Sequence, residues 1–291
     1  MTSKSVDRNP NNVEQLYTCP TCGNAIAGNF CQTCGEKKLD RHDFSFKHVI
    51  EEAFEGFTHF DNKFFRTAYL LLFKPGQLSV DFFNGRKVPY MRPFQMFVIC
   101  NILFFLLAGK VNFFAQPLSS FNDYDPYIQL GSKKIIDSIV KSEAQWQLLA
   151  VEFNERMASD SKAFLAIFIP VFALGSIGVN KNKRKFLAEH LVFSAHFFTF
   201  ILIFYTFFLV LIAQPYAKLA GQGFNQTFDM VSSLFCVSII SIYYGLAAKK
   251  FYGANSLRVI AGSVSIAILF MLALVSYRML LFYKIILNSQ F

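Results

Sequence analysis

The fold class of this chain is decided by residues 186–213, which read FLAEHLVFSAHFFTFILIFYTFFLVLIA. These 28 residues contain one acid, Glu189, and neither Lys nor Arg. An α-helix needs about 20 mainly apolar residues to cross a hydrocarbon core about 30 Å thick. We therefore predict that this stretch is a transmembrane helix.

Four other apolar stretches extend this prediction to most of the chain. They occupy residues 93–115, 163–179, 228–248 and 259–287. Only 16% of the 291 residues are charged, whereas about 25% is usual for a soluble domain. The composition predicts an all-α integral membrane protein with about five transmembrane helices, which form a domain over residues 93–291.

The charges of the loops predict the orientation of these helices. The segment 181–185, KNKRK, holds four basic residues and no acid, and Lys249, Lys250 and Arg258 lie between the last two spans. The loop between the third and fourth spans holds only Lys218. Because loops rich in Lys and Arg stay in the cytoplasm, we predict an inner-membrane (cytoplasmic-membrane) protein with a cytoplasmic N-terminus.

Residues 116–162 form the longest connection between spans. They hold seven acids and five basic residues, and part of this segment shows helical periodicity. Long loops follow the charge rule weakly, so we place this one outside the cytoplasm as a helical cap.

The region before the first span divides into three parts. Residues 1–18 are polar, predicted disordered, and lack the apolar stretch of a cleavable signal. Residues 19–39 contain a cysteine cluster. Residues 40–92 are predicted to form amphipathic helices, including 62–73 and 77–83, which either lie flat on the inner leaflet or form a small core of their own.

The cysteine cluster has the spacing of a metal site. Cys19, Cys22, Cys31 and Cys34 form the pattern C-x2-C-x8-C-x2-C, and a Gly follows each pair. Each C-x2-C-G turn can direct two thiolates at one ion, and two such turns complete the tetrahedral shell of structural zinc. We predict a zinc ribbon holding one Zn²⁺. Disulfides, a rubredoxin-like iron site and thiol redox chemistry are the alternatives.

Two features narrow the role of this ribbon. Four thiolate ligands leave no open position for water, so the role of the ion is structural. The chain carries a net charge of +9, but the ribbon has almost no positive charge before Lys37 and Lys38, which weighs against nucleic acid as its partner.

The sequence around the ribbon resembles a known family. The segments NFCQTCGEK, RHDFSFKHVIEEAFEGFTHFDNKFFRT and KPGQLSVDFFNGRKVPYMRPF, all within residues 19–100, are similar to the bacterial family catalogued as domain of unknown function 3667, common in Bacteroidota. The resemblance implies an N-terminal zinc ribbon followed by a membrane-embedded remainder, and it implies no particular activity.

Three basic residues just before the first span form a candidate binding site. Arg86, Lys87 and Arg92 lie in a Pro-rich segment on the predicted cytoplasmic side. They are suited to an anionic lipid head group or a phosphate. The alternative is a positively charged anchor combined with a turn.

Polar residues in the third span are the other candidates. Glu189, His190 and His196 are ionisable, and such groups inside spans are often functional. Glu189 and His196 share a helix face and could relay protons or bind a metal. Alternatively, Glu189 pairs with Lys185 near the interface.

These observations favour a non-enzymatic membrane protein that interacts with membrane lipids or a cytoplasmic protein partner, in envelope assembly or transport. No catalytic residue is assigned, because the chain lacks a nucleotide-binding Gly-rich loop, a nucleophile elbow and an H-E-x-x-H motif. The alternative is an integral-membrane enzyme or permease that acts on a lipid or small solute.

Overall fold

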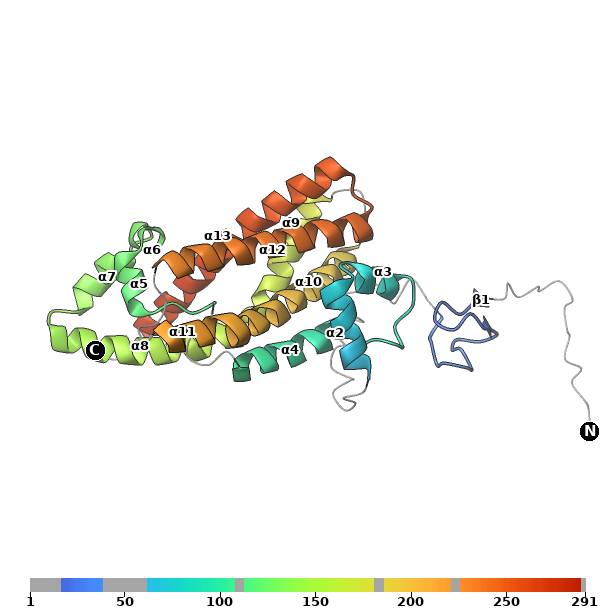
Figure 1. Ribbon diagram of the computed structural model, residues 1–291, viewed down its shortest axis with the longest axis horizontal. Helices are drawn as coiled ribbons and strands as arrows, with labels where there is room; N and C mark the ends of the chain where they lie inside the picture. Colours follow the sequence, from blue (N-terminus) through green and yellow to red (C-terminus); the bar gives the residue numbers. More distant parts are fainter. Residues whose placement is uncertain (1–16, 39–61, 108–112, 181–185, 221–225, 289–291) are drawn as a thin grey trace, which may run out of the picture.

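The protein is almost entirely helical, and a small cysteine-containing domain lies at one end (Figure 1). The computed structural model describes residues 17–38, 62–107, 113–180, 186–220 and 226–288. Three predicted features lie outside the described residues: residues 1–16 of the disordered segment, residues 40–61 of the amphipathic region and the basic segment 181–185.

Helix α10 (Leu187–Phe208) is the central element of the bundle. It continues through a π-helical turn, η3 (Leu209–Ala213), into α11 (Gln214–Ala220). Its neighbours are α4 (Pro93–Leu107) and α9 (Phe168–Val179). Aromatic rings fill the space between them, and Phe168 and Phe198 stack with centroids 5.1 Å apart. The high Phe content of the sequence thus serves helix packing.

Helices α12 (Gln226–Tyr252) and α13 (Ser256–Leu287) lie side by side, and α9 packs against α13. Small residues allow these close approaches. A Cβ atom at Gly175 would touch the side chain of Leu269, and one at Gly245 would lie 2.5 Å from the Ser263 hydroxyl. Membrane helices lack a hydrophobic force between them, so small residues that permit close contact are typical of their interfaces.

Three helical stretches among the described residues are long and apolar enough to cross a membrane: Leu187–Leu219, Met230–Tyr252 and Ser256–Leu287. The number rises to four if Glu143–Lys162 and Leu165–Val179, which meet at a bend of 49°, form one span. Only 22% of the most apolar window of Ser256–Leu287 is buried, against 56% for Leu187–Leu219. The outer helices therefore present broad apolar surfaces, as lipid-facing helices do.

The predicted first span, 93–115, falls short of this test, as does the predicted span 163–179 when α8 is not counted with it. Helix α4 has 15 residues, which at 1.5 Å per residue is about 22 Å. That is less than the hydrocarbon thickness of about 30 Å. The predicted count of five spans is therefore not established by helix length, and residues 108–112 lie outside the described residues.

The segment predicted as a helical cap is indeed helical. It forms α5 (Leu118–Asp123), α6 (Asp125–Gln129), α7 (Ser132–Ile139) and α8 (Glu143–Ala163). Arg278 of α13 donates to the hydroxyl of Tyr127 at 2.9 Å, and Lys284 pairs with Asp160 at 2.9 Å. These polar contacts hold the cap against the end of α13.

At the opposite end lie α2 (Lys63–Phe73) and α3 (Gln77–Phe83). Both were predicted from the sequence with nearly these bounds. Their neighbours are α10 and α12, and the Tyr243 hydroxyl donates to the carbonyl of Leu71 at 2.7 Å. The two helices thus pack on the membrane bundle and do not form a separate core.

Candidate metal centre and its docking loop

The cysteine domain is built from two turns of the same design. In the first, the N–H of Cys19 donates to the carbonyl of Asn24, and the N–H of Gly23 donates to the carbonyl of Cys19. Cys31, Gly35 and Glu36 repeat this arrangement. Gly23 and Gly35 have φ of 80° and 74°, a left-handed conformation that glycine adopts without strain. The C-x2-C-G sequence thus specifies each turn locally.

A minimal hairpin connects the two turns. Strand β1 (Tyr17–Thr18) pairs antiparallel with β2 (Ala25–Ile26), and an isolated bridge joins Phe30 to Lys37. Ile26 is the main apolar side chain buried with the cysteines. A core of this size cannot stabilise a fold by itself. We therefore expect the stability of this domain to come from cross-linking of the cysteines.

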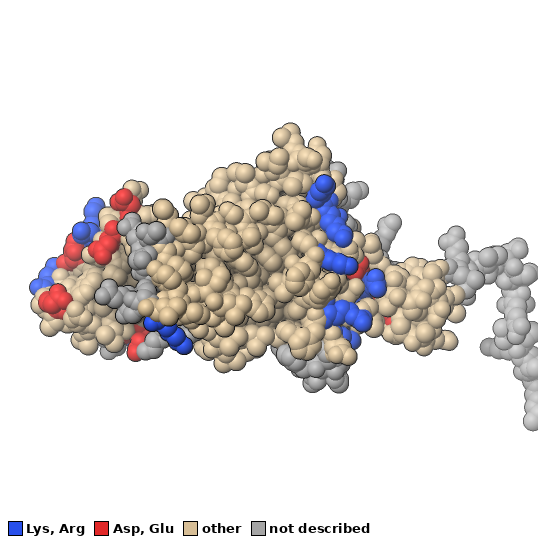
Figure 2. Space-filling model, viewed as in Figure 1, with Lys and Arg blue, Asp and Glu red and all other residues tan. Residues whose placement is uncertain are grey.

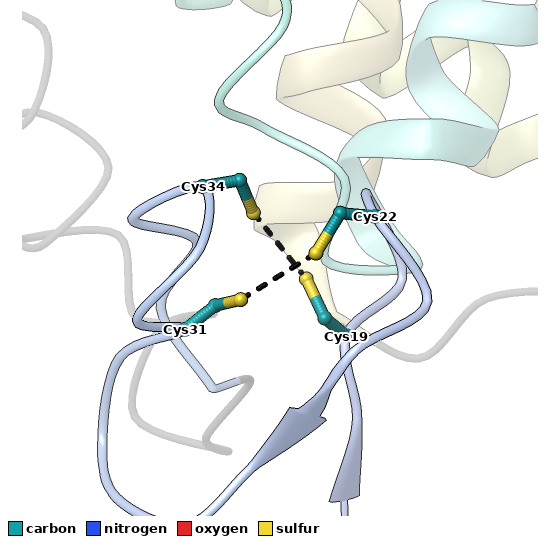
Figure 3. Close-up of side chains that lie close together, drawn as sticks. All are labelled: Cys19, Cys22, Cys31 and Cys34. Carbon is teal, nitrogen blue, oxygen red and sulfur yellow. Dashed lines mark hydrogen bonds between the residues drawn. The ribbon is translucent and has the colours of Figure 1, made fainter.

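The four cysteine side chains point toward a common centre (Figure 3). The Sγ atoms of Cys19 and Cys34 are 3.5 Å apart, as are those of Cys22 and Cys31, and all four lie within 4.8 Å of one another. Four sulfurs bound tetrahedrally at about 2.3 Å from a zinc ion would be about 3.8 Å apart. The sulfur atoms therefore have the spacing that a tetrahedral metal ion requires.

The thiols of this cluster differ in acidity. The backbone N–H of Cys34 is the main cause that lowers the pKa of Cys31 to about 6. For Cys34, the N–H of Glu36 lowers the pKa, but burial and the neighbouring thiols outweigh it and raise the pKa to about 12. Thiolates this close repel one another, so a divalent cation is what allows all four to be charged.

Glu36 connects the cysteine domain to the helical body. Its side chain is buried, and one oxygen, Oε2, accepts three hydrogen bonds. One comes from the Thr21 hydroxyl at 2.6 Å, within the domain. The other two come from the backbone N–H groups of Lys87 and Val88, both at 3.0 Å. Residues 84–92, which join α3 to α4, are called the docking loop below.

The three basic residues predicted to bind an anion have different surroundings in the structure. Arg86 is exposed and lines a cavity, and its guanidinium lies 5.9 Å from the ring centroid of Tyr90. The Lys87 ammonium lies over the ring of Phe82, 4.5 Å from its centroid. Arg92 is half-buried, and neither it nor Lys87 lines that cavity.

Each ionisable residue of α10 contacts a different partner among the described residues. The Glu189 carboxylate accepts the N–H of Phe186 at 3.2 Å, which caps the helix. His190 Nδ1 lies 2.9 Å from the Tyr252 hydroxyl.

His196 lies deeper in the same helix. Its Nδ1 is 2.9 Å from the Ser79 hydroxyl of α3, and both side chains are buried. The bond joins α3 to the central helix. A hydrogen bond of this kind, between two buried polar side chains, is typical of a structural contact.

Sequence reasoning missed Glu36, Lys74 and Lys250. Glu36 follows the last C-x2-C-G turn directly, and an acid at that position is the signal that could have been noticed. Lys74 and Lys250 line the same cavity as Arg86, although Lys74 directly follows α2 and Lys250 belongs to α12, far away in the sequence. No sequence pattern reveals that proximity.

Comparison with known proteins supports the resemblance drawn from the sequence. No match was found among curated proteins or among solved structures. The family described as Protein of unknown function (DUF3667) matches residues 61–105, which cover α2, α3, the docking loop and most of α4. With its four-cysteine cluster near the N-terminus, this chain is therefore recognised as one that carries the DUF3667 segment, at residues 61–105.

Proposed function

We propose that this chain is a five-span protein of the bacterial inner membrane, without enzymatic activity, whose cytoplasmic end binds anionic membrane lipid or a cytoplasmic protein partner in envelope assembly or transport. A single zinc ion folds the N-terminal ribbon. The observation that carries the proposal is the separation of charges along the molecule.

Figure 2 makes that separation visible on one face. Lys and Arg gather at the end that holds the cysteine domain, called the basic end below. Acidic and basic residues mix over the cap at the opposite end, and a broad band without visible charge lies between them. A band of this kind matches a bilayer core, and the excess of Lys and Arg at one end favours the cytoplasm for that end.

The five proposed spans are α4, residues 163–179 with α9 as their main helix, α10 with α11, α12, and α13. Helix α4 is short, but it packs against α10 along the same direction (Figure 1). A short helix can be accommodated beside longer ones by local thinning of the bilayer. With five spans, the N-terminus is cytoplasmic and the C-terminus is on the other side.

Reporter fusions test this topology. A fusion of alkaline phosphatase to the C-terminus should be active, because this enzyme folds only in an oxidising compartment. A green fluorescent protein fused after Gly253, in the α12–α13 turn, should fluoresce. If alkaline phosphatase is inactive at the C-terminus, and a green fluorescent protein fused there fluoresces, the five-span arrangement is contradicted.

Zinc is the metal that this ribbon suits best. Four thiolates in a closed tetrahedral shell favour zinc or iron, and the reducing cytoplasm keeps the cysteines free to bind it. Metal analysis of protein purified without added metal should find about one zinc per chain. A stoichiometric amount of iron, or no metal, would reject the zinc assignment.

The role of the ribbon follows from its position. A closed shell offers no site for catalysis. Glu36, which the folded ribbon positions, instead accepts hydrogen bonds from two backbone N–H groups of the docking loop. The ribbon therefore stabilises the docking loop, which belongs to the part of the protein that matches DUF3667.

An enzyme or permease is the weaker interpretation. It would need Glu189, His196 and Arg86 to meet around one substrate. Glu189 caps a helix, and His196 bonds to Ser79, whereas Arg86 lines a separate cavity. This dispersion favours a binding protein.

A further inference from the structure

A cavity of about 760 Å³ opens at the basic end, between α2, α3, the docking loop and the last turns of α12. Ligand sites commonly have volumes of about 300–1,000 Å³. The polar part of its lining consists of Lys74, Gln77, Asp81, Arg86, Tyr90 and Lys250. Its size and its polar groups mark it as a candidate binding site.

The close contact of α2 and α3 with α12 creates this cavity. Gly76, in the turn between α2 and α3, has φ of 77°, and a Cβ atom there would lie 2.6 Å from the carbonyl oxygen of Ala247. Only glycine allows the turn to approach the helix backbone so closely. Lys74 and Lys250 are thereby brought to the two sides of one opening.

The charge of the cavity is positive. Lys74, Arg86 and Lys250 are exposed, and within the described residues none of them forms an ion pair with a carboxylate. The one acid, Asp81, already accepts hydrogen bonds from Gln77 at 2.6 Å and from Tyr90 at 2.9 Å. The cavity is thus lined by three cations and by one carboxylate that is already hydrogen-bonded within the protein. This arrangement suits an anion with several oxygens, such as phosphate.

The rest of the lining is apolar. Leu70, Phe73, Pro75 and Leu246 form this wall. Phe73 and Leu246 are 69% and 54% exposed, and so they are open to whatever surrounds the helices. A soluble anion would leave this wall unused. A molecule that joins a phosphate to an acyl chain would contact both walls.

We propose that this cavity binds the phosphate of an anionic amphiphile, with Lys74, Arg86 and Lys250 as its ligands and the acyl chain along Phe73 and Leu246. The inference rests on the proposed function, because it requires the basic end to lie at the inner leaflet. It replaces Lys87 and Arg92 of the sequence-based hypothesis with Lys74 and Lys250.

Native mass spectrometry of the full chain in a non-ionic detergent tests this site. The probes are a short-chain phosphatidic acid, the matching phosphatidylcholine and inorganic phosphate. The test variant is Arg86→Gln/Lys250→Gln. The control is Lys249→Gln/Arg258→Gln, which removes the same charge from the same end at positions that do not line the cavity.

We expect one phosphatidic acid per chain, bound more tightly than either other probe. Loss of two charge-assisted contacts should weaken this binding by about a hundredfold in the test variant. The control should change it by less than about threefold. The variant Arg86→Lys/Lys250→Arg should retain binding. That result would show that the test variant loses affinity because it lacks the two charges, and not because it is misfolded.

Three results would overturn the inference. Equal weakening in the control would mean that lipid binds to the general charge of the basic end, and the proposed function would remain. Binding of inorganic phosphate as tight as that of phosphatidic acid would identify a soluble anion as the ligand. If the wild-type chain binds no phosphatidic acid, lipid binding is wrong in both proposals, whereas the zinc and topology experiments are unaffected.

Discussion

Replacement of Glu36 by Ala tests whether the ribbon holds the docking loop. The Glu36 side chain is 2% exposed, and its Oε2 atom accepts the N–H groups of Lys87 and Val88 at 3.0 Å. A hydrogen bond to a charged group contributes about 1.5–3 kcal/mol net, so the loss of both should weaken docking by about 3–6 kcal/mol. Because Glu36 is not a metal ligand, the metal content should stay unchanged.

Amide hydrogen exchange measures this effect directly. The Lys87 and Val88 amides should exchange faster in Glu36→Ala by about a hundredfold or more, since about 1.4 kcal/mol corresponds to a factor of ten. Glu36→Gln keeps an accepting oxygen but loses the charge, and neutral hydrogen bonds are about half as strong, so its effect should be intermediate.

Gln32→Ala is the matched control, because Gln32 is exposed on the same ribbon. It should leave the exchange of both amides unchanged. If Glu36→Ala retains its metal and also the slow exchange of Lys87 and Val88, the reasoning is refuted. A chelator should reproduce the Glu36→Ala pattern, because a ribbon without its cross-link cannot position that carboxylate.

Three further predictions follow from single contacts. Cys22→Ser should lower the amount of metal bound per chain and make the ribbon sensitive to protease. The helix content measured by circular dichroism should stay the same, and full metal occupancy would argue against a four-thiolate site. Gly76→Ala should lower the thermal midpoint and the affinity for phosphatidic acid together, because its Cβ would meet the carbonyl of Ala247 and a left-handed φ costs about 1 kcal/mol or more; an unchanged midpoint would contradict that contact. Ser79→Ala should destabilise the folded protein by about 1–3 kcal/mol, because His196 Nδ1 is left buried without its partner, and a neutral result in a denaturation assay would remove the structural role of this pair.

The sequence alone determined the features that depend on neighbouring residues. The four cysteines and their glycines lie within one short segment, and each C-x2-C-G turn closes through its own backbone hydrogen bonds. Helices over 62–73 and 77–83 were predictable because Pro75-Gly76 and Asn84-Gly85 mark their ends. The long apolar stretches of α10, α12 and α13 were predictable because lipid requires continuous apolar helices.

The tertiary structure decided everything that depends on which helices meet. The structure places His196 beside Ser79 of α3, a partner that the sequence could not identify, and the proton relay stays a prediction. Lys74 and Lys250 share a cavity because Gly76 packs against Ala247. Glu36 reaches the docking loop because the ribbon folds back on it. Contacts between distant segments depend on the packing of side chains, and this packing cannot be predicted from composition and periodicity.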